Sequence, residues 1–173
     1  VDIVIPSMDY LRENISKIQG IIITHAHEDH IGALPYLLKE IRIPVYGTAF
    51  ILGIVRNKLV EFELNTYVDL NLVNPGETLQ IEPFNIEFIR ISHSTVDGVG
   101  LVIDTPKGII VHTRDFRISH NTDQSKNTDV SSFVRHGERG ILVLLSDSTN
   151  AEVEGYTVSE QEVAKNLSKL ISG

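Results

Sequence analysis

The chain has 173 residues, of which 42% are hydrophobic and 22% are charged, so it is large enough to bury the core of one globular domain. It contains no cysteine, which excludes a disulfide framework and a thiolate metal site, and its net charge of −8 argues against a simple nucleic-acid-binding module, which is expected to be basic. No apolar run approaches the ~20 residues of a membrane span, so we expect a cytoplasmic protein without a membrane segment.

The first half of the chain is predicted to alternate short strands with helices. Brief β-branched runs indicate strands, whereas longer apolar runs with a capping residue indicate helices. The expected strands are residues 1–5, 20–23, 44–46 and 70–73. The expected helices are a short helix or turn at 9–16, a helix at 31–39, and a helix at 48–63 with Thr48 as its N-cap.

The second half is predicted to be richer in strands and turns. The expected strands are residues 79–81, 85–91, 99–104, 108–112 and 141–145, the last of which is apolar throughout and therefore expected to be buried. Residues 74–77 and 105–108 have the composition of turns, and the polar stretch 121–129 is predicted to be a loop. Thr157 and Glu160 form a capping box that predicts a helix to about residue 171.

A seven-residue run starting at Thr24 holds three imidazoles and two carboxylates directly after an apolar triplet. Imidazole nitrogen and carboxylate oxygen are the ligands of catalytic Zn²⁺ sites. His25 and His27 are two residues apart, so in an extended segment they lie on one side and can hold one ion, while Asp29 and His30 turn toward a second. The spacing predicts a two-metal site, with Glu28 solvated or beside the ligands.

The pattern His25-x-His27-x-Asp29-His30 resembles the signature of the metallo-β-lactamase superfamily. The resemblance implies that the first two histidines bind one ion and that the Asp29–His30 pair binds the other. It also implies an α/β (α+β) protein with an αββα sandwich fold. The expected cofactors are two Zn²⁺ ions, with Mn²⁺ or Mg²⁺ as alternatives.

Two further ligands are implied by the same resemblance. His93 ends the alternating run 85–91 and fits the third ligand of the first ion. Asp115 follows the expected strand 108–112 and fits the carboxylate that bridges both ions. The resemblance thereby implies catalytic roles for three of these ligands: Asp29, His30 and Asp115.

Longer segments narrow the resemblance to ribonuclease J, a family in the β-CASP branch of metallo-β-lactamase-fold nucleases. These segments are residues 24–38, 54–59, 93–94 and 144–150. The resemblance implies that Asp147, after the last core strand, supports the metal site and marks the entry to a β-CASP domain. Residues 1–147 then correspond to a core that is incomplete at its N-terminus, and residues 148–173 to the start of the β-CASP domain.

Ser94 either orients substrate or contacts a ligand, or it is an ordinary hydrogen-bond partner at a strand end.

The family resemblance also implies an activity. It is that of a zinc-dependent ribonuclease that hydrolyses RNA phosphodiesters as a 5′-to-3′ exonuclease and endonuclease, in rRNA processing and mRNA decay. RNA is then the expected partner, and the complete protein is expected to form homo- or hetero-oligomers.

One residue departs from the family pattern. Arg114 stands where the family usually has glycine before the bridging aspartate; its Cβ disfavours backbone conformations that glycine permits, and its charge opposes metal binding if it points inward. An outward orientation has no such effect. Two alternatives therefore stay open: a weakly active or non-catalytic partner subunit of a nuclease complex, and another hydrolase or oxygenase of the same fold.

Overall fold

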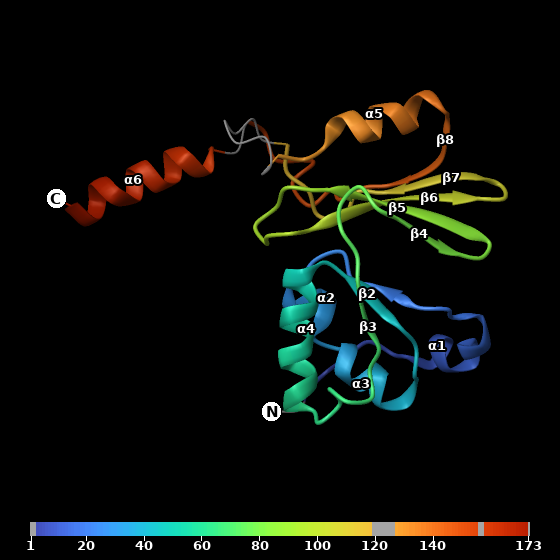
Figure 1. Ribbon diagram of the computed structural model, residues 1–173. Helices are drawn as coiled ribbons and strands as arrows, with labels where there is room; N and C mark the ends of the chain where they lie inside the picture. Colours follow the sequence, from blue (N-terminus) through green and yellow to red (C-terminus); the bar gives the residue numbers. More distant parts are fainter. Residues whose placement is uncertain (1–2, 119–126, 156–157, 173) are drawn as a thin grey trace.

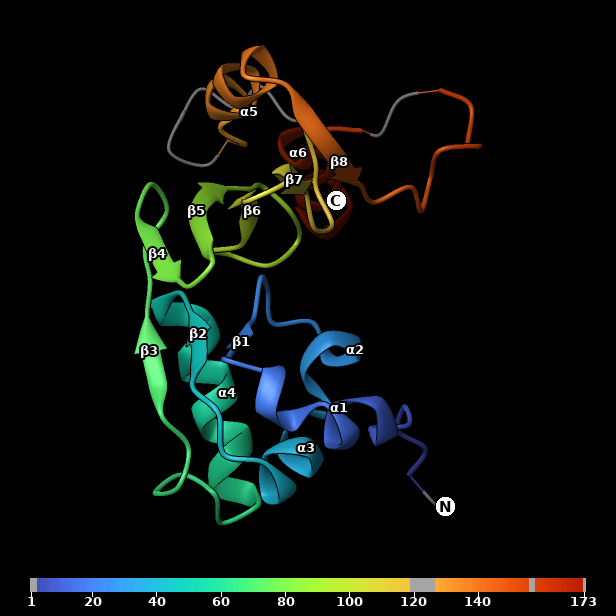
Figure 2. The same cartoon turned by 90° about the vertical axis from the view of Figure 1, so that its right-hand side faces the viewer.

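The computed structural model describes residues 3–118, 127–155 and 158–172. Two β-sheets face each other in the middle of the molecule, and helices lie on the outer side of each sheet (Figures 1 and 2). This is the αββα sandwich that the family resemblance implied.

The first sheet is parallel and is flanked by most of the helices. Its strands, in the order β1-β2-β3, are β1 (Ile21–Ile22), β2 (Val45–Gly47) and β3 (Leu70–Leu72). The helices are α1 (Asp9–Glu13), η1 (Ile15–Lys17), α2 (Glu28–Ile31), α3 (Leu34–Glu40) and α4 (Ala49–Glu61). Buried side chains from α2, α3 and α4 meet Val45 of β2 in an apolar cluster that fixes this half of the sandwich.

The second sheet has five strands and one covering helix. The strands, in spatial order, are β4 (Thr78–Ile81), β5 (Phe84–Arg90), β6 (Val99–Thr105), β7 (Gly108–His112) and β8 (Ile141–Leu145). Neighbours pair antiparallel up to β7, and β8 pairs parallel with β7. Helix α5 (Val130–Glu138) packs Phe133 against Ile89, Val102 and Val111, and the Asp129 side chain caps the helix by accepting a hydrogen bond from Ser132 N–H.

The two sheets are joined by a buried cluster between them. Phe88 and Val99 of the second sheet pack with Val73, and Ile22 and Tyr46 of the first sheet lie against this group. Strands β5, β7 and β8 run in the same direction, so the segments that follow them emerge at one edge. The backbone N–H of Val99 donates to the Thr24 carbonyl, which brings the segment after β1 to the same edge.

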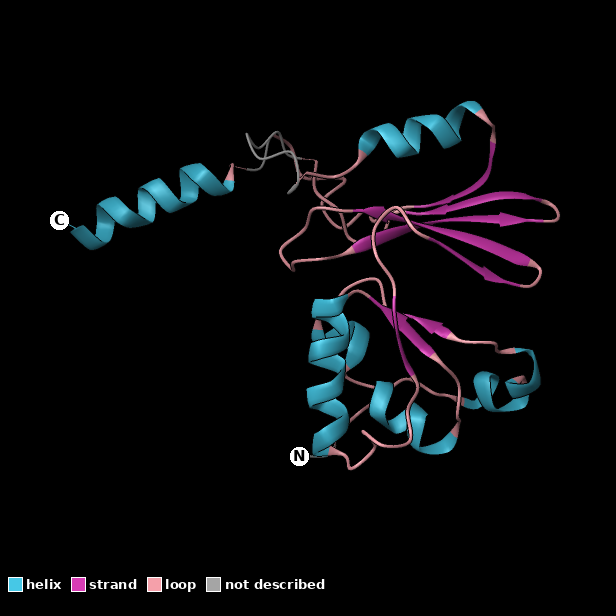
Figure 3. Cartoon of the chain, viewed as in Figure 1, coloured by secondary structure: helices cyan, strands magenta, loops and turns pink. Residues whose placement is uncertain are grey.

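Helix α6 (Glu160–Ser172) lies apart from the sandwich (Figures 1 and 3). The hydroxyl of Ser159 accepts a hydrogen bond from the Glu162 N–H, so Ser159 caps this helix. The predicted capping residue, Thr157, lies outside the described residues. Within the described part of the chain, no helix combines the length and the apolarity needed to cross a bilayer.

Several local predictions were wrong. Residues 3–5 form no strand, and Ile3 and Val4 are exposed, whereas residues 1–2 lie outside the described part of the chain. The helix predicted at 31–39 begins later, at Leu34, because residues 32–33 form a turn after α2 and Pro35 lies in the first turn of α3, where its missing N–H is tolerated. Thr48 stands at the N-cap position of α4, but its hydroxyl donates to the Asp97 carbonyl and does not cap the helix.

The predicted strand 141–145 is present as β8, but its burial was wrongly predicted. The four residues after Ile141 are exposed, by 58% for Leu142 and 62% for Leu144. The reason is the position of β8, which is the last strand of the sheet and pairs only with β7 among the described residues.

Helix α5 was not predicted. Residues 127–129 of the predicted loop are irregular, as expected, while residues 121–126 lie outside the described residues.

Candidate metal centre

The candidate ligands lie at the edge of the sandwich where successive strands end. His25, His93 and Asp115 each come three residues after the last residue of β1, β5 and β7, respectively. Short segments leaving neighbouring strands in one direction are held close together by the strand pairing. The sheet topology therefore brings together residues that are up to 90 positions apart in the sequence.

Four of the predicted ligands converge in space. One donor atom from each of four residues lies within 4.8 Å of the others: His25, His27, His93 and Asp115. The Oδ2 atom of Asp115 is 3.4 Å from His25 Nε2 and 3.6 Å from His93 Nε2. Two donor atoms that bind the same ion, each at about 2.0–2.2 Å, are separated from each other by distances of this size. The geometry therefore fits a single divalent cation.

Two buried nitrogen atoms without hydrogen-bond partners also indicate a divalent cation at this position. The Nε2 atoms of His25 and His93 are buried and have no hydrogen-bond partner. Buried polar atoms nearly always have a partner, so two such atoms facing one carboxylate need an explanation. A metal ion bound between them supplies the missing partner for both, and the residues present fit a divalent metal.

One ring nitrogen of His27 already has a hydrogen-bond partner. Its Nε2 atom lies 2.9 Å from the hydroxyl oxygen of Ser94, which leaves Nδ1 available for an ion. A ligating histidine commonly has its second nitrogen held by a neighbouring polar group, which fixes the ring orientation. Ser94 is in the position to do this for His27.

Asp29 and His30, the predicted ligands of the second ion, lie on the short helix α2 at the rim of the group. His30 Nε2 is 3.9 Å from Asp115 Oδ2 and 3.5 Å from Asp29 Oδ2. The same Asp115 oxygen is therefore near His25, His93 and His30. The Asp29 side chain is 80% exposed, and neither residue belongs to the convergent set of four.

Glu28, which was expected to be solvated or beside the ligands, is tied to another helix. Its Oε1 atom lies 2.6 Å from Nζ of Lys58 on α4. The carboxylate is largely exposed, so this ion pair contributes little to stability. It connects the helix that carries Asp29 and His30 to the longest helix of the first layer.

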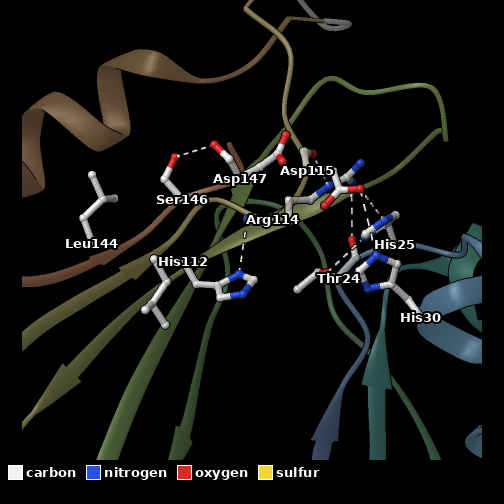
Figure 4. Close-up of a pocket in the computed structure, with 10 residues that line it drawn as sticks. Thr24, His25, His30, His112, Arg114, Asp115, Leu144, Ser146 and Asp147 are labelled. Carbon is white, nitrogen blue, oxygen red and sulfur yellow. Dashed lines mark hydrogen bonds and ion pairs between the residues drawn. The ribbon is translucent and has the colours of Figure 1, made fainter. Parts of the chain in front are cut away.

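A cavity of about 490 Å³ opens beside these residues (Figure 4). His25, His30, Arg114 and Asp115 line one part of it, and Asp147 lies in another part. Hydrogen bonds from the hydroxyl and the N–H of Thr149 hold the pKa of Asp147 below its usual range, so this carboxylate is ionised at neutral pH. Asp147 therefore adds negative charge to the cavity wall, in line with its predicted supporting position.

Arg114 points inward, which the sequence had left open. It is 3% exposed, its Nε donates to the Asp115 carbonyl at 2.8 Å, and its Nη1 donates to the Thr24 carbonyl at 3.4 Å. Its Nη2 atom is buried without a hydrogen-bond partner. The backbone of Arg114 has φ of 55°, the left-handed conformation that glycine adopts most easily. Figure 4 shows its side chain beside Asp115 and His25.

Gly98 makes room for this side chain. A Cβ atom on Gly98 would lie 1.1 Å from Nη1 of Arg114, so the guanidinium occupies the space that any other residue at 98 would fill. Gly98 was not predicted to contribute to the site, because nothing in the local sequence links position 98 with position 114. Only the fold brings the two together.

Burial and the guanidinium charge shift the ionisation of the ligands. Burial, followed by the charge of Arg114, lowers the pKa of His25 to about 4, and the same two causes lower the pKa of His93. Burial lowers the pKa of Arg114 itself to about 10, so it remains charged at neutral pH. Both imidazoles are therefore neutral at pH 7, the form in which histidine binds metal.

Comparison with known proteins agrees with this geometry. Ribonuclease J of Synechocystis sp. is 44% identical over 174 residues, which cover 99% of this chain and 27% of that protein. Ribonuclease J of Helicobacter pylori is 46% identical over 165 residues, which cover 95% of this chain and 24% of that protein. The chain thus spans about a quarter of the length of these relatives, and the predicted resemblance to ribonuclease J is confirmed.

Structural comparison supports the fold. A crystal structure of a protein of unknown function from Enterococcus faecalis V583 superimposes with a TM-score of 0.62 over 87% of this chain and 38% of that chain, at 16% sequence identity. A family model described as "Beta-lactamase superfamily domain" matches residues 3–149. Because this match covers most of the chain and agrees with the αββα layers, the chain belongs to the beta-lactamase superfamily.

Proposed function

We propose that this chain forms the metal centre of a ribonuclease that hydrolyses RNA phosphodiester bonds. The observation that carries the proposal is the convergence of His25, His27, His93 and Asp115 around two unpartnered imidazole nitrogens. Such a site is typical of metal-dependent hydrolysis. The similarity to ribonuclease J proteins over nearly the whole chain supports RNA as the substrate.

The proposed ligands divide into two groups. His25, His27, His93 and Asp115 hold the first ion, while Asp29, His30 and Asp115 hold a second. We expect Zn²⁺, because the ligands are imidazoles and carboxylates, with Mn²⁺ or Mg²⁺ as alternatives. When bound, a divalent ion acts as a Lewis acid that polarises a phosphoryl oxygen and makes water a better nucleophile.

The side chains of the chain have separate tasks in this reaction. Water forms a new bond to phosphorus while the bond from phosphorus to the leaving ribose oxygen breaks, and this oxygen takes up a proton from the solvent. Asp29 is exposed beside His30 and accepts the proton of the attacking water. Asp115 contacts three of the histidines through its Oδ2 atom, and Ser94 orients His27. Asp147 lines the same cavity.

Finer features are proposed on the similarity to the relatives. They are 5′-to-3′ exonuclease and endonuclease action in rRNA processing and mRNA decay, a cytoplasmic location, and assembly into homo- or hetero-oligomers. We also propose that residues 1–147 are the metallo-β-lactamase core and that residues 148–173 begin a β-CASP domain. The separation of α6 from the sandwich supports this boundary.

A chimera tests the proposal in the context of a full-length relative. The 174 matching residues of Synechocystis ribonuclease J are replaced by this chain, and the product is assayed on 5′-monophosphorylated RNA. We expect metal-dependent cleavage that is lost in the matched His93→Ala and Asp29→Ala chimeras. A folded, metal-loaded chimera that leaves RNA intact would overturn the proposal.

A second candidate is a non-catalytic partner subunit of a nuclease complex. The observation that favours it is the buried charge of Arg114 beside the ligands. In that case the chimera binds metal but remains inactive, and the Arg114→Gly chimera regains cleavage. Hydrolysis of a β-lactam or a thioester without cleavage of RNA would instead indicate another hydrolase of this fold.

A further inference from the structure

Arg114 and Gly98 form a matched pair at the wall of the metal centre. The guanidinium lies in the space left by the missing side chain at position 98, and its Nε and Nη1 atoms donate to the carbonyls of Asp115 and Thr24. Both of these carbonyls belong to the segments that carry ligands. The guanidinium is therefore held in place and cannot swing out to solvent without losing its contacts.

This arrangement is unfavourable for folding in two ways. A non-glycine residue in the left-handed conformation is strained, and a buried N–H without a partner loses its hydration without compensation. Residues that retain such strain are commonly found at functional sites. The position of Arg114, next in sequence to the central carboxylate Asp115, agrees with this pattern.

The charge of Arg114 acts on any cation in the cavity. Two divalent ions together with the guanidinium would bring three positive groups into a cavity whose lining contains the carboxylates of Asp115 and Asp147. The first ion would be bound by four convergent donors, which offset the repulsion by the guanidinium. The second would have the exposed Asp29, His30 and a share of Asp115, and it would be repelled by both the first ion and Arg114.

We propose that Arg114, seated on Gly98, is a fixed cation at the wall of the metal centre that disfavours a second metal ion, so that the centre holds one divalent ion tightly and a second only weakly. The proposal rests on the proposed function, since it assumes that the four-residue group binds metal. Arg114 then determines how many ions the centre binds.

Titration with Co²⁺ tests the proposal directly, because the visible absorption of Co²⁺ reports its ligands and does not depend on catalysis. The metal-free chain is titrated beside three variants, with folding checked by circular dichroism. Arg114→Met removes the charge but keeps a side chain of comparable length, Arg114→Gly removes both the charge and the strain, and Arg114→Lys keeps the charge. Bound metal is counted independently by plasma mass spectrometry.

We expect one tightly bound ion in the natural chain and in Arg114→Lys. In Arg114→Met and Arg114→Gly, we expect the second ion to bind at least about tenfold more tightly, because a repulsive charge has been removed. Equal second-ion affinity in the natural chain, Arg114→Met and Arg114→Gly would overturn the proposal while leaving the metal centre intact. Absence of any bound ion in all four proteins would overturn both the metal centre and this proposal.

Discussion

The hydroxyl oxygen of Ser94 lies 2.9 Å from Nε2 of His27, although the two residues are 67 positions apart in the sequence. Ser94 follows directly after His93, another residue of the ligand group. One short segment after β5 therefore both contributes a ligand and contacts a second ligand from the segment after β1. The metal centre depends on this contact between the two sheets.

Substitution of Ser94 by alanine is expected to weaken metal binding about tenfold with little effect on folding. The change leaves Nε2 of His27 without its partner, so the ring loses its preferred orientation toward the other ligands. Competition with a chelator of known zinc affinity measures the change. Ser92→Ala is the matched control, because it removes a hydroxyl on the other side of His93 and leaves the Ser94–His27 contact in place. Equal affinities for the two variants would contradict the role of Ser94.

Substitution of Gly98 by alanine is expected to destabilise the chain by about 1–3 kcal/mol, because the added methyl group would overlap the guanidinium of Arg114. The same substitution in an Arg114→Gly background is expected to cost less than about 0.5 kcal/mol. Urea unfolding of the two single variants and the double variant measures the coupling. Additive effects of the two substitutions would show that the two positions do not interact.

The pKa of His25 makes the metal-free chain sensitive to acid. In the folded chain this pKa is lowered to about 4 by burial and by Arg114, below the value of 6.5 expected when the chain is unfolded. Between these values only the unfolded chain takes up the proton, so the free energy of unfolding falls as the pH decreases from 6.5 toward 4, by up to about 1.4 kcal/mol per pH unit. The pKa of His93 is shifted in the same direction and adds to the effect.

Urea unfolding of the metal-free chain at several pH values measures this dependence. His25→Gln is the comparison variant, because glutamine does not titrate and is of similar size. The slope below pH 6.5 is expected to be shallower in His25→Gln than in the natural chain. Identical slopes would contradict the lowered pKa of His25.

His136 is expected to anchor α5 to the second sheet. Its buried Nε2 atom lies 2.7 Å from Oε2 of Glu87 on β5, and its Nδ1 atom accepts from Arg139. His136→Ala leaves these groups without their buried partner and is expected to cost about 1–3 kcal/mol in urea unfolding. Arg135 binds the same carboxylate from an exposed position, so Arg135→Ala is expected to cost less than about 1 kcal/mol. A larger loss for Arg135→Ala would reverse this ranking.

Much of the site could be predicted because its signals are local. The spacing of His25, His27, Asp29 and His30 is visible in seven residues, and His93 and Asp115 each follow a recognisable strand. The layered fold followed from the family resemblance. The start of α3 was also visible in Pro35, because proline favours the first turn of a helix.

The remaining features depend on contacts that a single sequence does not contain. The inward direction of Arg114 is determined by Gly98, which the strand pairing of β6 and β7 brings next to it. The exposure of β8 depends on its position at the edge of the sheet. The sequence does not show this position, because an apolar run has the same pattern in an edge strand as in a central strand. Ser94 could be nominated as a neighbour of a ligand, but its contact with His27 required both sheets.

X-ray absorption spectroscopy of the chain loaded with one equivalent of Zn²⁺ counts the imidazoles bound to the ion and so tests the proposed metal centre itself. We expect three imidazole nitrogens at about 2.0–2.1 Å with at least one oxygen ligand, and two imidazoles in the His93→Ala variant. Coordination by oxygen alone, or an unchanged spectrum in His93→Ala, would contradict a metal centre built from His25, His27, His93 and Asp115.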